Sequence, residues 1–453
     1  MNIRRICTLF LALAVLSGIL SGAMAETPEG PAVSAENVIY MQDGLLYISQ
    51  DGGMVYYCDY ANGQCRPLCT REDCNHGAAA GLDLGSFPYP SAKEFMNDAS
   101  SGLCYGARLA FASMPYAFSP NTCVMYEGKI YFFAAFYPEP QPGTNTLPLY
   151  VSEVDGKTRL LADPGSLFSG AYDPVVLDAA AYDGYLYYLV YLPEKQLMEG
   201  EKAIAPDPDL PAGSYQLLKC SMTTGEASIL ETFRGENCEV KLAGLYDGVL
   251  YYRIQTMNGL GIVTTEEEYR KGMLSKTRYS VMGIDVATGG TVLPDRRFCD
   301  RSREYGEPFD IVKDGILYGI VLPETAEDHT ALFLGYDLNR RETVLEYPFE
   351  YIETEYYPYR VLTDEVMLAF DFETGTFALL NLKTGETSPL SIPGACRTGN
   401  AGQTDWYDLF TVCFQTDPLV LDHCRADGSA GKAYITAEEL LGDNPQMHDF
   451  IEK

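Results

Sequence analysis

Short hydrophobic stretches alternate with turn signals along most of this chain. In one recurring pattern, an apolar stretch is followed by Asp-Gly or a related pair, and then by apolar residues that commonly end in Tyr. Asp-Gly between two apolar runs is a strong hairpin signal, because a tight two-residue turn needs positive φ angles. The pattern occurs at residues 42–47, 126–131, 182–187, 246–251 and 313–318, with degenerate copies at 363–368 and 405–410.

A second pattern follows each copy of the first. It consists of an apolar stretch, a polar residue, Thr-Gly or a similar pair, and another apolar stretch; its copies lie at residues 57–63, 154–156, 218–225, 283–289, 335–340, 380–385 and 421–428. Each unit therefore predicts two hairpins, or four strands, and four-stranded units in series form β-propellers. We predict an all-β fold, a single β-propeller domain at residues 26–453 with about seven four-stranded blades. A capping box and a terminal glycine predict a short C-terminal helix at residues 436–442.

The longest segments without either pattern lie at residues 138–148, 193–213 and 255–277, between the two hairpins of a blade. A still longer insertion, about residues 69–120, separates the first and second blades. Because the tight turns occupy one end of each blade, we expect these insertions to emerge together on the opposite face. Long loops on a rigid scaffold commonly carry function, so this face is the expected binding surface, unless the insertions are merely tolerated.

The beginning of the chain has the features of a signal peptide. Arg4 and Arg5 precede an apolar run at residues 6–20, and Ala23-Met24-Ala25 matches an Ala-x-Ala cleavage site. We expect cleavage after Ala25. Ala23 occupies the position at which a bacterial lipobox would place the lipid-bearing cysteine, so we predict a secreted protein of the extracellular space or cell envelope, not lipid-anchored. No later run of about 18 apolar residues predicts insertion into a membrane.

The charge balance limits the classes of partner that the chain can bind. The chain has 63 acidic and 32 basic residues and a formal net charge of −31. Such a surface repels phosphate backbones and anionic lipids, so we exclude nucleic acid as a partner. We expect a monomer that meets an extracellular protein, peptide or glycan.

The insertion opens with the motif Leu68-Cys69-x4-Cys74-x-His76. Here the chain resembles secreted or lipid-anchored proteins of gut Firmicutes, whose Tyr-rich propellers are related to the TolB-like and low-density-lipoprotein-receptor-like types. In that family a similar phrase ends the first blade and is usually followed by a further cysteine, for which Cys104 is the candidate. The resemblance implies the fold and the location but no activity. The missing lipobox cysteine is a departure from the family pattern, and it puts membrane anchoring in doubt.

Two kinds of cross-link are open for this motif. Cys69, Cys74, His76 and Cys104 supply three thiols and one imidazole, which suffice for a tetrahedral zinc site, although the spacing is unusual for zinc. The three cysteines could instead form a disulfide that staples the insertion outside the cell, or the motif could do neither. No other cofactor is predicted. Separately, Cys58 and Cys65 flank one hairpin turn, and we expect them to pair across it.

Catalytic signatures are scarce. The sequence contains no Gly-x-Ser-x-Gly, His-Glu-x-x-His or phosphate-binding glycine loop, and only four histidines. The first hypothesis is therefore a non-catalytic binding or scaffold propeller; the alternative is a carbohydrate- or peptide-processing enzyme with carboxylates in the central funnel. The predicted loop face carries two acidic clusters that are candidate binding residues or simply solvated surface: Asp207 and Asp209, and Glu266, Glu267 and Glu268.

Overall fold

The structure is a computed structural model of the 453-residue chain. It describes residues 38–40, 44–48, 54–59, 64–69, 74, 76, 92–97, 103–113, 124–133, 147–153, 158–168, 174–193, 213–234, 238–257, 277–302, 310–321, 330–350, 356–363, 365–371, 376–390, 397–398, 406–407, 409–410, 419–424, 430–442, 445–449 and 451–452. The predicted leader, residues 1–25, lies outside these ranges. No helix within the described part of the chain is long and apolar enough to cross a membrane.

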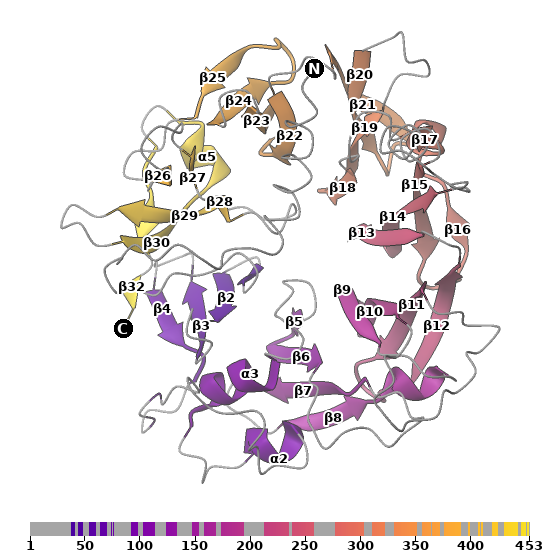
Figure 1. Ribbon diagram of the computed structural model, residues 1–453, viewed down its shortest axis with the longest axis vertical. Helices are drawn as coiled ribbons and strands as arrows, with labels where there is room; N and C mark the ends of the chain where they lie inside the picture. Colours follow the sequence, from indigo (N-terminus) through magenta and orange to yellow (C-terminus); the bar gives the residue numbers. More distant parts are fainter. Residues whose placement is uncertain are drawn as a thin grey trace, which may run out of the picture. The chain divides into compact units, whose positions relative to one another are not determined.

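Within the described ranges, the strands form seven sheets of four or five strands, here called blades 1 to 7, and one two-stranded sheet (Figure 1). Blade 1 contains β1 (Val38–Tyr40), β2 (Gly44–Ile48), β3 (Val55–Asp59), β4 (Gln64–Pro67) and β32 (Ile451–Glu452). Blade 2 contains β5 (Val124–Tyr126), β6 (Lys129–Phe133), β7 (Leu149–Glu153) and β8 (Arg159–Ala162). Blade 3 contains β9 (Val175–Tyr182), β10 (Tyr185–Leu192), β11 (Ser214–Ser221) and β12 (Ala227–Phe233).

The later blades repeat this plan. Blade 4 contains β13 (Glu239–Tyr246), β14 (Val249–Met257), β15 (Thr277–Asp285), β16 (Thr291–Val292) and β17 (Arg301–Ser302), and blade 5 contains β18 (Asp310–Lys313), β19 (Ile316–Val321), β20 (Thr330–Asp337) and β21 (Glu342–Glu350). Blade 6 contains β22 (Tyr356–Val361), β23 (Val366–Asp371), β24 (Thr376–Asn381) and β25 (Thr387–Pro389). Blade 7 contains β28 (Leu409–Phe410), β29 (Leu419–Cys424), β30 (Ala430–Ile435) and β31 (His448–Asp449), preceded by the hairpin of β26 (Arg397–Thr398) and β27 (Trp406–Tyr407).

The first turn of a blade has the backbone that its sequence demands. Asp183 and Gly184 both have positive φ, 47° and 75°, in the turn between β9 and β10. Asp247 and Gly248, at 46° and 74°, form the equivalent turn between β13 and β14. Positive φ at both central residues gives a hairpin turn whose twist matches that of the strands, and glycine adopts it without steric cost.

The turn between the third and fourth strands of a blade is held by a side chain at the end of the third strand. Asp285 accepts hydrogen bonds from the backbone N–H groups of Ala287 (3.0 Å) and Thr288 (2.8 Å). These bonds lower the pKa of Asp285, with the backbone bond to Thr288 contributing most. Asn381 makes the same pair of bonds in blade 6. In these two blades, the polar residue before the Thr-Gly pair is therefore a turn former.

Hydrophobic clusters join each blade to the next. One cluster links blades 2 and 3 through residues such as Phe133 and Tyr188, whose rings meet edge to face at 5.2 Å. Equivalent clusters span blades 1 and 2, 3 and 4, 4 and 5, 5 and 6, and 6 and 7. The first strands of blades 2 to 5 also contact one another in succession. This is the packing of a β-propeller, in which the first strand of each blade is innermost.

Blade 1 receives its last strand from the C-terminal part of the chain. β32 pairs in parallel with β4, with Ile451 opposite Gln64 and Glu452 opposite Cys65 (Figure 1). Since β31 belongs to blade 7 and β32 to blade 1, the chain passes directly from the last blade to the first. The contacts between blades therefore form a closed cycle, and the predicted β-propeller fold is confirmed.

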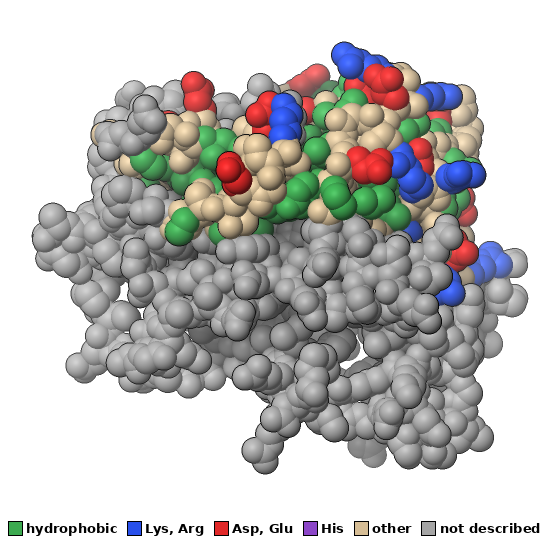
Figure 2. Space-filling view, turned by 90° about the horizontal axis from the view of Figure 1, so that it is seen from above, with side chains coloured by type: hydrophobic (Ala, Val, Ile, Leu, Met, Phe, Trp, Pro, Cys, Tyr) green, Lys and Arg blue, Asp and Glu red, His purple; other side chains and the backbone are tan. Residues whose placement is uncertain are grey.

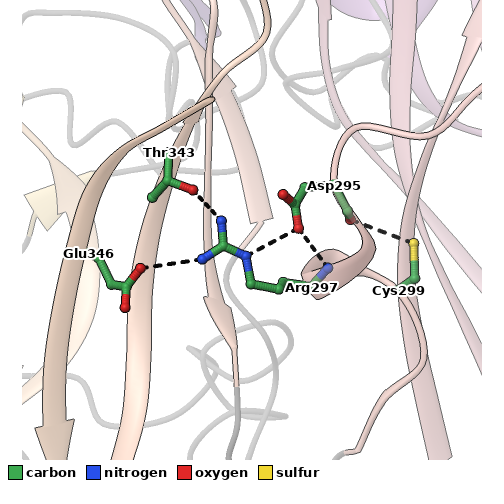
Figure 3. A network of polar contacts seen from close by, with 5 residues as sticks. All are labelled: Asp295, Arg297, Cys299, Thr343 and Glu346. Carbon is green, nitrogen blue, oxygen red and sulfur yellow. Dashed lines mark hydrogen bonds and ion pairs between the residues drawn. The ribbon is translucent and has the colours of Figure 1, made fainter. Parts of the chain in front are cut away.

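Polar contacts add to the joint between blades 4 and 5. In the short helix η6 (Arg296–Phe298), Arg297 bonds Asp295 and reaches across to Thr343 and Glu346 on β21 (Figure 3). Cys299 lies beside this network, with its thiol 3.7 Å from the carbonyl of Asp295.

On one side of the molecule, described side chains of both charges lie interspersed among apolar ones (Figure 2).

The same two blades share a buried ion pair. Arg301 Nη2 lies 2.8 Å from Asp310 Oδ2, and the two side chains are 3% and 0% exposed. Arg301 Nη1 donates to the carbonyl of Ile320 at 2.7 Å, and its guanidinium lies 5.6 Å from the ring centroid of Phe298. Arg301 comes from β17 and Asp310 from β18, so the pair joins blade 4 to blade 5 directly.

The predicted C-terminal helix is α5 (Ala437–Leu440), and its capping box is complete. The Thr436 hydroxyl accepts from the N–H of Glu439 at 3.2 Å, and the Glu439 carboxylate accepts from the N–H of Thr436 at 3.0 Å. The other Glu439 oxygen lies 2.5 Å from His448 Nε2, and His448 stacks on Tyr434. Burial opposes ionisation of Glu439, but the hydrogen bonds from His448 and Thr436 outweigh it and lower the pKa of this carboxyl.

Candidate metal centre

Four potential metal ligands converge at the exit of blade 1. The sulfurs of Cys69, Cys74 and Cys104 and a ring nitrogen of His76 all lie within 4.8 Å of one another. All three cysteines are free thiols in the structure. The four residues singled out from the sequence are thus brought together, including Cys104, which is 28 positions beyond His76.

Cys69 is fixed by the edge of blade 1. The residue before it, Leu68, donates its N–H to the carbonyl of Val55 on β3 at 2.8 Å. The N–H of Cys69 then bonds the carbonyl of Pro67 at 2.7 Å, which turns the chain tightly at the end of β4. The side chain of Leu68 is buried in the cluster between blades 1 and 2, so the position of Cys69 depends on the packing of the propeller itself.

Cys104 lies at the start of a helix in the insertion. It directly precedes α3 (Tyr105–Ser113), and its carbonyl accepts the first helical bond, from Arg108 at 3.0 Å. The backbone N–H groups of Ala107 and Gly106, in the first turn of α3, favour the thiolate of Cys104 and so lower its pKa. A helix N-terminus stabilises a thiolate because its free N–H groups point at the negative charge.

Burial acts on Cys104 in the opposite sense. Its side chain is 2% exposed, and desolvation raises the pKa of the thiol to about 11, aided by the nearby Cys74 and Cys69. The helix N–H groups lower that pKa but do not outweigh burial.

Close packing holds α3 against blade 1. A Cβ atom on Gly106 would lie 2.8 Å from the carbonyl oxygen of Val55, 3.0 Å from Met54 Sδ and 3.2 Å from the carbonyl oxygen of Leu68. The helix therefore approaches β3 as closely as only a glycine permits. Met54 also lies 3.5 Å, sulfur to sulfur, from Cys104, so the buried side of the cluster is apolar.

His76 forms the outer side of the cluster. It is exposed, and its φ of 49° places it in the left-handed region. This conformation is uncommon for a residue with a side chain, although histidine is among those that tolerate it. The cluster therefore has an exposed imidazole, two half-buried thiols at Cys69 and Cys74, and a buried thiol at Cys104.

A second helix connects the insertion to blade 2. The side chain of Asn97, at the end of α2 (Ala92–Asn97), donates to the carbonyl of Thr158 at 2.8 Å and accepts from its N–H at 3.1 Å. The Thr158 hydroxyl in turn bonds Ser152 at 2.7 Å. Since α2 also contacts α3, the described part of the insertion bridges blades 1 and 2.

The structure describes one of the other predicted sites, the cysteine pair of blade 1, but not the two acidic clusters. Cys58 and Cys65 lie opposite each other on β3 and β4 and form a disulfide. The two acidic clusters, Asp207 with Asp209 and the three glutamates at 266–268, lie outside the described residues.

The alternative hypothesis, an enzyme with carboxylates in the central funnel, concerns the charged side chains on the innermost strands of the blades. Asp178 on β9 accepts from the N–H of Leu242 on β13 at 3.3 Å, and so joins blades 3 and 4. Lys313 on β18 donates to the carbonyls of Val361 and Leu362, at 3.0 and 3.2 Å, and joins blades 5 and 6. Together with Asp310, these side chains make structural contacts between blades.

Sequence reasoning missed the two helices of the insertion and the role of Gly106. The signal for α3 was present, because Ala107, Leu109 and the alanines at 110 and 112 are strong helix formers. The close approach at Gly106 depends on the packing of α3 against β3, which no local pattern reveals.

Comparison with known proteins gives a distant structural similarity. No protein-family model and no curated protein sequence matches the chain. The β-propeller domain of the Trilobed protease from Pyrococcus furiosus aligns with a TM-score of 0.41 and 10% identity over 90% of this chain and 94% of that one. An oligogalacturonate lyase from Vibrio parahaemolyticus gives 0.39 and 11% over 73% and 76%, and an ACO/RPE65 chimera gives 0.37 and 16% over 77% and 69%. The chain is therefore distantly similar in structure to β-propeller domains, and the similarity says nothing of activity.

Proposed function

We propose that the chain is an exported, non-catalytic binding or scaffold propeller that recognises an extracellular protein, peptide or glycan with its loop-bearing end. The observation that supports this is where the long segments leave the sheets. Residues 134–146, 194–212 and 258–276 each connect the second and third strands of a blade. The strand ends that these segments join lie at the end of the blade opposite to the Asp-Gly turn, and long loops on a rigid scaffold commonly carry binding sites.

Rigidity supports the proposal as well. The closing pair of β32 and β4, the clusters between blades and the buried pair of Arg301 and Asp310 all fix neighbouring blades. Fixed ends lower the entropy cost of binding relative to a loop on a mobile scaffold, because part of the ordering is already present before binding.

The register of blade 4 suggests the variant that tests the proposal. Met257 at the end of β14 lies directly opposite Thr277 at the start of β15. Asn-Gly in place of residues 258–276 should therefore close the hairpin with a tight turn and leave the sheet intact. The control is Asp247→Asn, a substitution in the turn at the other end of the same blade that keeps a residue suited to positive φ.

The assay is binding of the purified chain to arrays of glycans and of peptides. We expect the wild type and Asp247→Asn to bind the same array members and the shortened variant to lose some of them, with circular dichroism unchanged in all three. If the shortened variant binds as well as the wild type, this loop is not part of the binding surface. Conversion of a bound glycan or peptide, detected by mass spectrometry, would favour the enzymatic alternative.

A further inference from the structure

We infer that Cys69, Cys74, His76 and Cys104 bind one Zn²⁺ in a closed structural site that joins blade 1 to its insertion. This inference is independent of the proposed binding function. Its basis is the convergence of all four donor atoms to within 4.8 Å of one another.

The spacing of the donors fits a single tetrahedral ion. With Zn–S bonds of about 2.3 Å, a tetrahedral site places its sulfurs about 3.8 Å apart. The observed upper limit of 4.8 Å leaves shifts of about 1 Å or less, within reach of side-chain rotation. A [4Fe–4S] cluster would bind each ligand to a different iron and a [2Fe–2S] cluster would divide the ligands between two irons, so either would hold some of the donors farther apart than one ion does.

The kind of donor selects the metal. Three thiolates and one imidazole form a Cys₃His set, which is a common structural zinc site, whereas calcium and magnesium prefer oxygen ligands. Four protein ligands also fill the tetrahedron and leave no position for a water or substrate. The site is therefore structural, and not a source of activated water.

The charge is balanced by the surrounding backbone. Each bound thiol releases its proton to solvent, so three thiolates and Zn²⁺ leave one net negative charge. Cys104 directly precedes α3, so the backbone N–H groups of Gly106 and Ala107, in the first turn of that helix, lie near its sulfur. They would disperse that charge as outer-shell donors, as the hydrogen bonds around metal-bound ligands commonly do.

The site links three stretches of chain that the propeller alone does not connect. Cys69 follows β4 after one residue, Cys74 and His76 lie in the first part of the insertion, and Cys104 directly precedes α3. A single ion would close the loop from Cys69 to Cys104 and hold α3 on β3. Through α2 and its bonds to Thr158, it would also stabilise the joint between blades 1 and 2.

A disulfide would involve only two of these four residues. Any one bridge among the three cysteines leaves the third thiol and His76 without a role. In the structure all three are free, while Cys58 and Cys65, which is four positions before Cys69, form a disulfide. The two chemistries differ in mass and in metal content, which makes them separable by experiment.

The test is metal analysis of the full chain, exported by its own leader and purified without reductant or chelator. We expect one zinc per chain, with zinc content at least tenfold lower in Cys74→Ser and Cys104→Ala. The matched control is Cys238→Ala, which also removes a buried free thiol but lies outside the site, and should keep the zinc. A wild type without zinc after purification in added zinc, or one whose mass shows a second disulfide, would overturn the inference.

His76 provides a variant that should not disturb folding, since its side chain is exposed. Cobalt replaces zinc in such sites and reports the ligands by its visible and near-ultraviolet absorption. We expect thiolate-to-cobalt charge transfer in the wild type and a shifted ligand-field spectrum in His76→Asn, with unchanged circular dichroism. Identical cobalt spectra for the two proteins would exclude His76 from the site and refute the four-ligand assignment.

Discussion

Replacing Arg301 with methionine should destabilise the propeller strongly, because the change leaves a buried carboxylate without its partner. Methionine keeps most of the apolar stem of arginine but removes the guanidinium. Asp310, whose side chain is 0% exposed, then loses its ion pair at 2.8 Å. The carbonyl of Ile320 loses a donor at 2.7 Å in the same step.

The magnitude follows from these contacts. A hydrogen bond to a charged group contributes about 1.5–3 kcal/mol and a bond to a neutral carbonyl rather less. Breaking a buried pair from one side costs about 3–5 kcal/mol, since the remaining charge is uncompensated. We expect a loss in the free energy of unfolding within that range. Adding Asp310→Asn to Arg301→Met should recover part of it, because the amide carries no charge.

Urea unfolding followed by circular dichroism measures this loss. The control is Lys241→Met, which breaks the pair of Lys241 with Glu239 at 2.9 Å, where the side chains are 52% and 37% exposed. Exposed pairs contribute less than about 1 kcal/mol. This expectation is wrong if Lys241→Met and Arg301→Met lower the free energy of unfolding by the same amount, or if Arg301→Met lowers it by less than about 1 kcal/mol. Burial would then not be what makes the pair between blades 4 and 5 important.

Three further predictions concern other joints. Gly106→Ala should cost about 1–3 kcal/mol in thermal unfolding, although alanine favours helices, because its Cβ would meet the carbonyl oxygen of Val55 at 2.8 Å; a stabilised variant would contradict the close packing of α3. Replacing both Cys58 and Cys65 with alanine should cost about 2–3 kcal/mol, as expected for a bridge between residues seven apart, and an unchanged melting temperature would show that the bridge is not formed. Because the pKa of Glu439 is lowered in the fold, its stabilising effect is present above its ordinary value of 4.5 and lost as pH falls. The melting temperatures of wild type and Glu439→Gln should therefore converge in acid, and a constant gap would refute the contribution of the carboxylate.

Local chemistry accounts for the part of the fold that the sequence predicts. The turns at Asp183-Gly184 and Asp247-Gly248 have the positive φ angles that their residues favour, so each hairpin can be assigned without knowledge of the rest of the chain. Four strands per unit and about seven units then follow from counting. The helix at 436–442 was predictable for the same reason, because the capping box of Thr436 and Glu439 is local.

The site could be predicted only in part. The Cys/His motif identifies Cys69, Cys74 and His76 by their proximity in sequence, whereas Cys104 entered as a candidate through resemblance to a family. That its sulfur meets the others depends on α3 packing against β3, which is a long-range contact. The pairing of Arg301 with Asp310 was not predicted either, since an arginine and an aspartate nine positions apart in a polar stretch look solvent-exposed.

The parallel pair of β32 and β4 has a consequence for the order in which the chain folds. Ile451 and Gln64 are partners although nearly the whole propeller separates them along the chain. Such a contact has a very high sequence separation, and closing so long a loop is slow compared with forming the local hairpins. The hairpins of blades 2 to 6 are local and can form early, whereas blade 1 gains its fifth strand only when the last residues arrive. Until then β4 presents an open edge that can pair with another chain, so β32 protects that edge of the first blade against aggregation as well as closing the propeller.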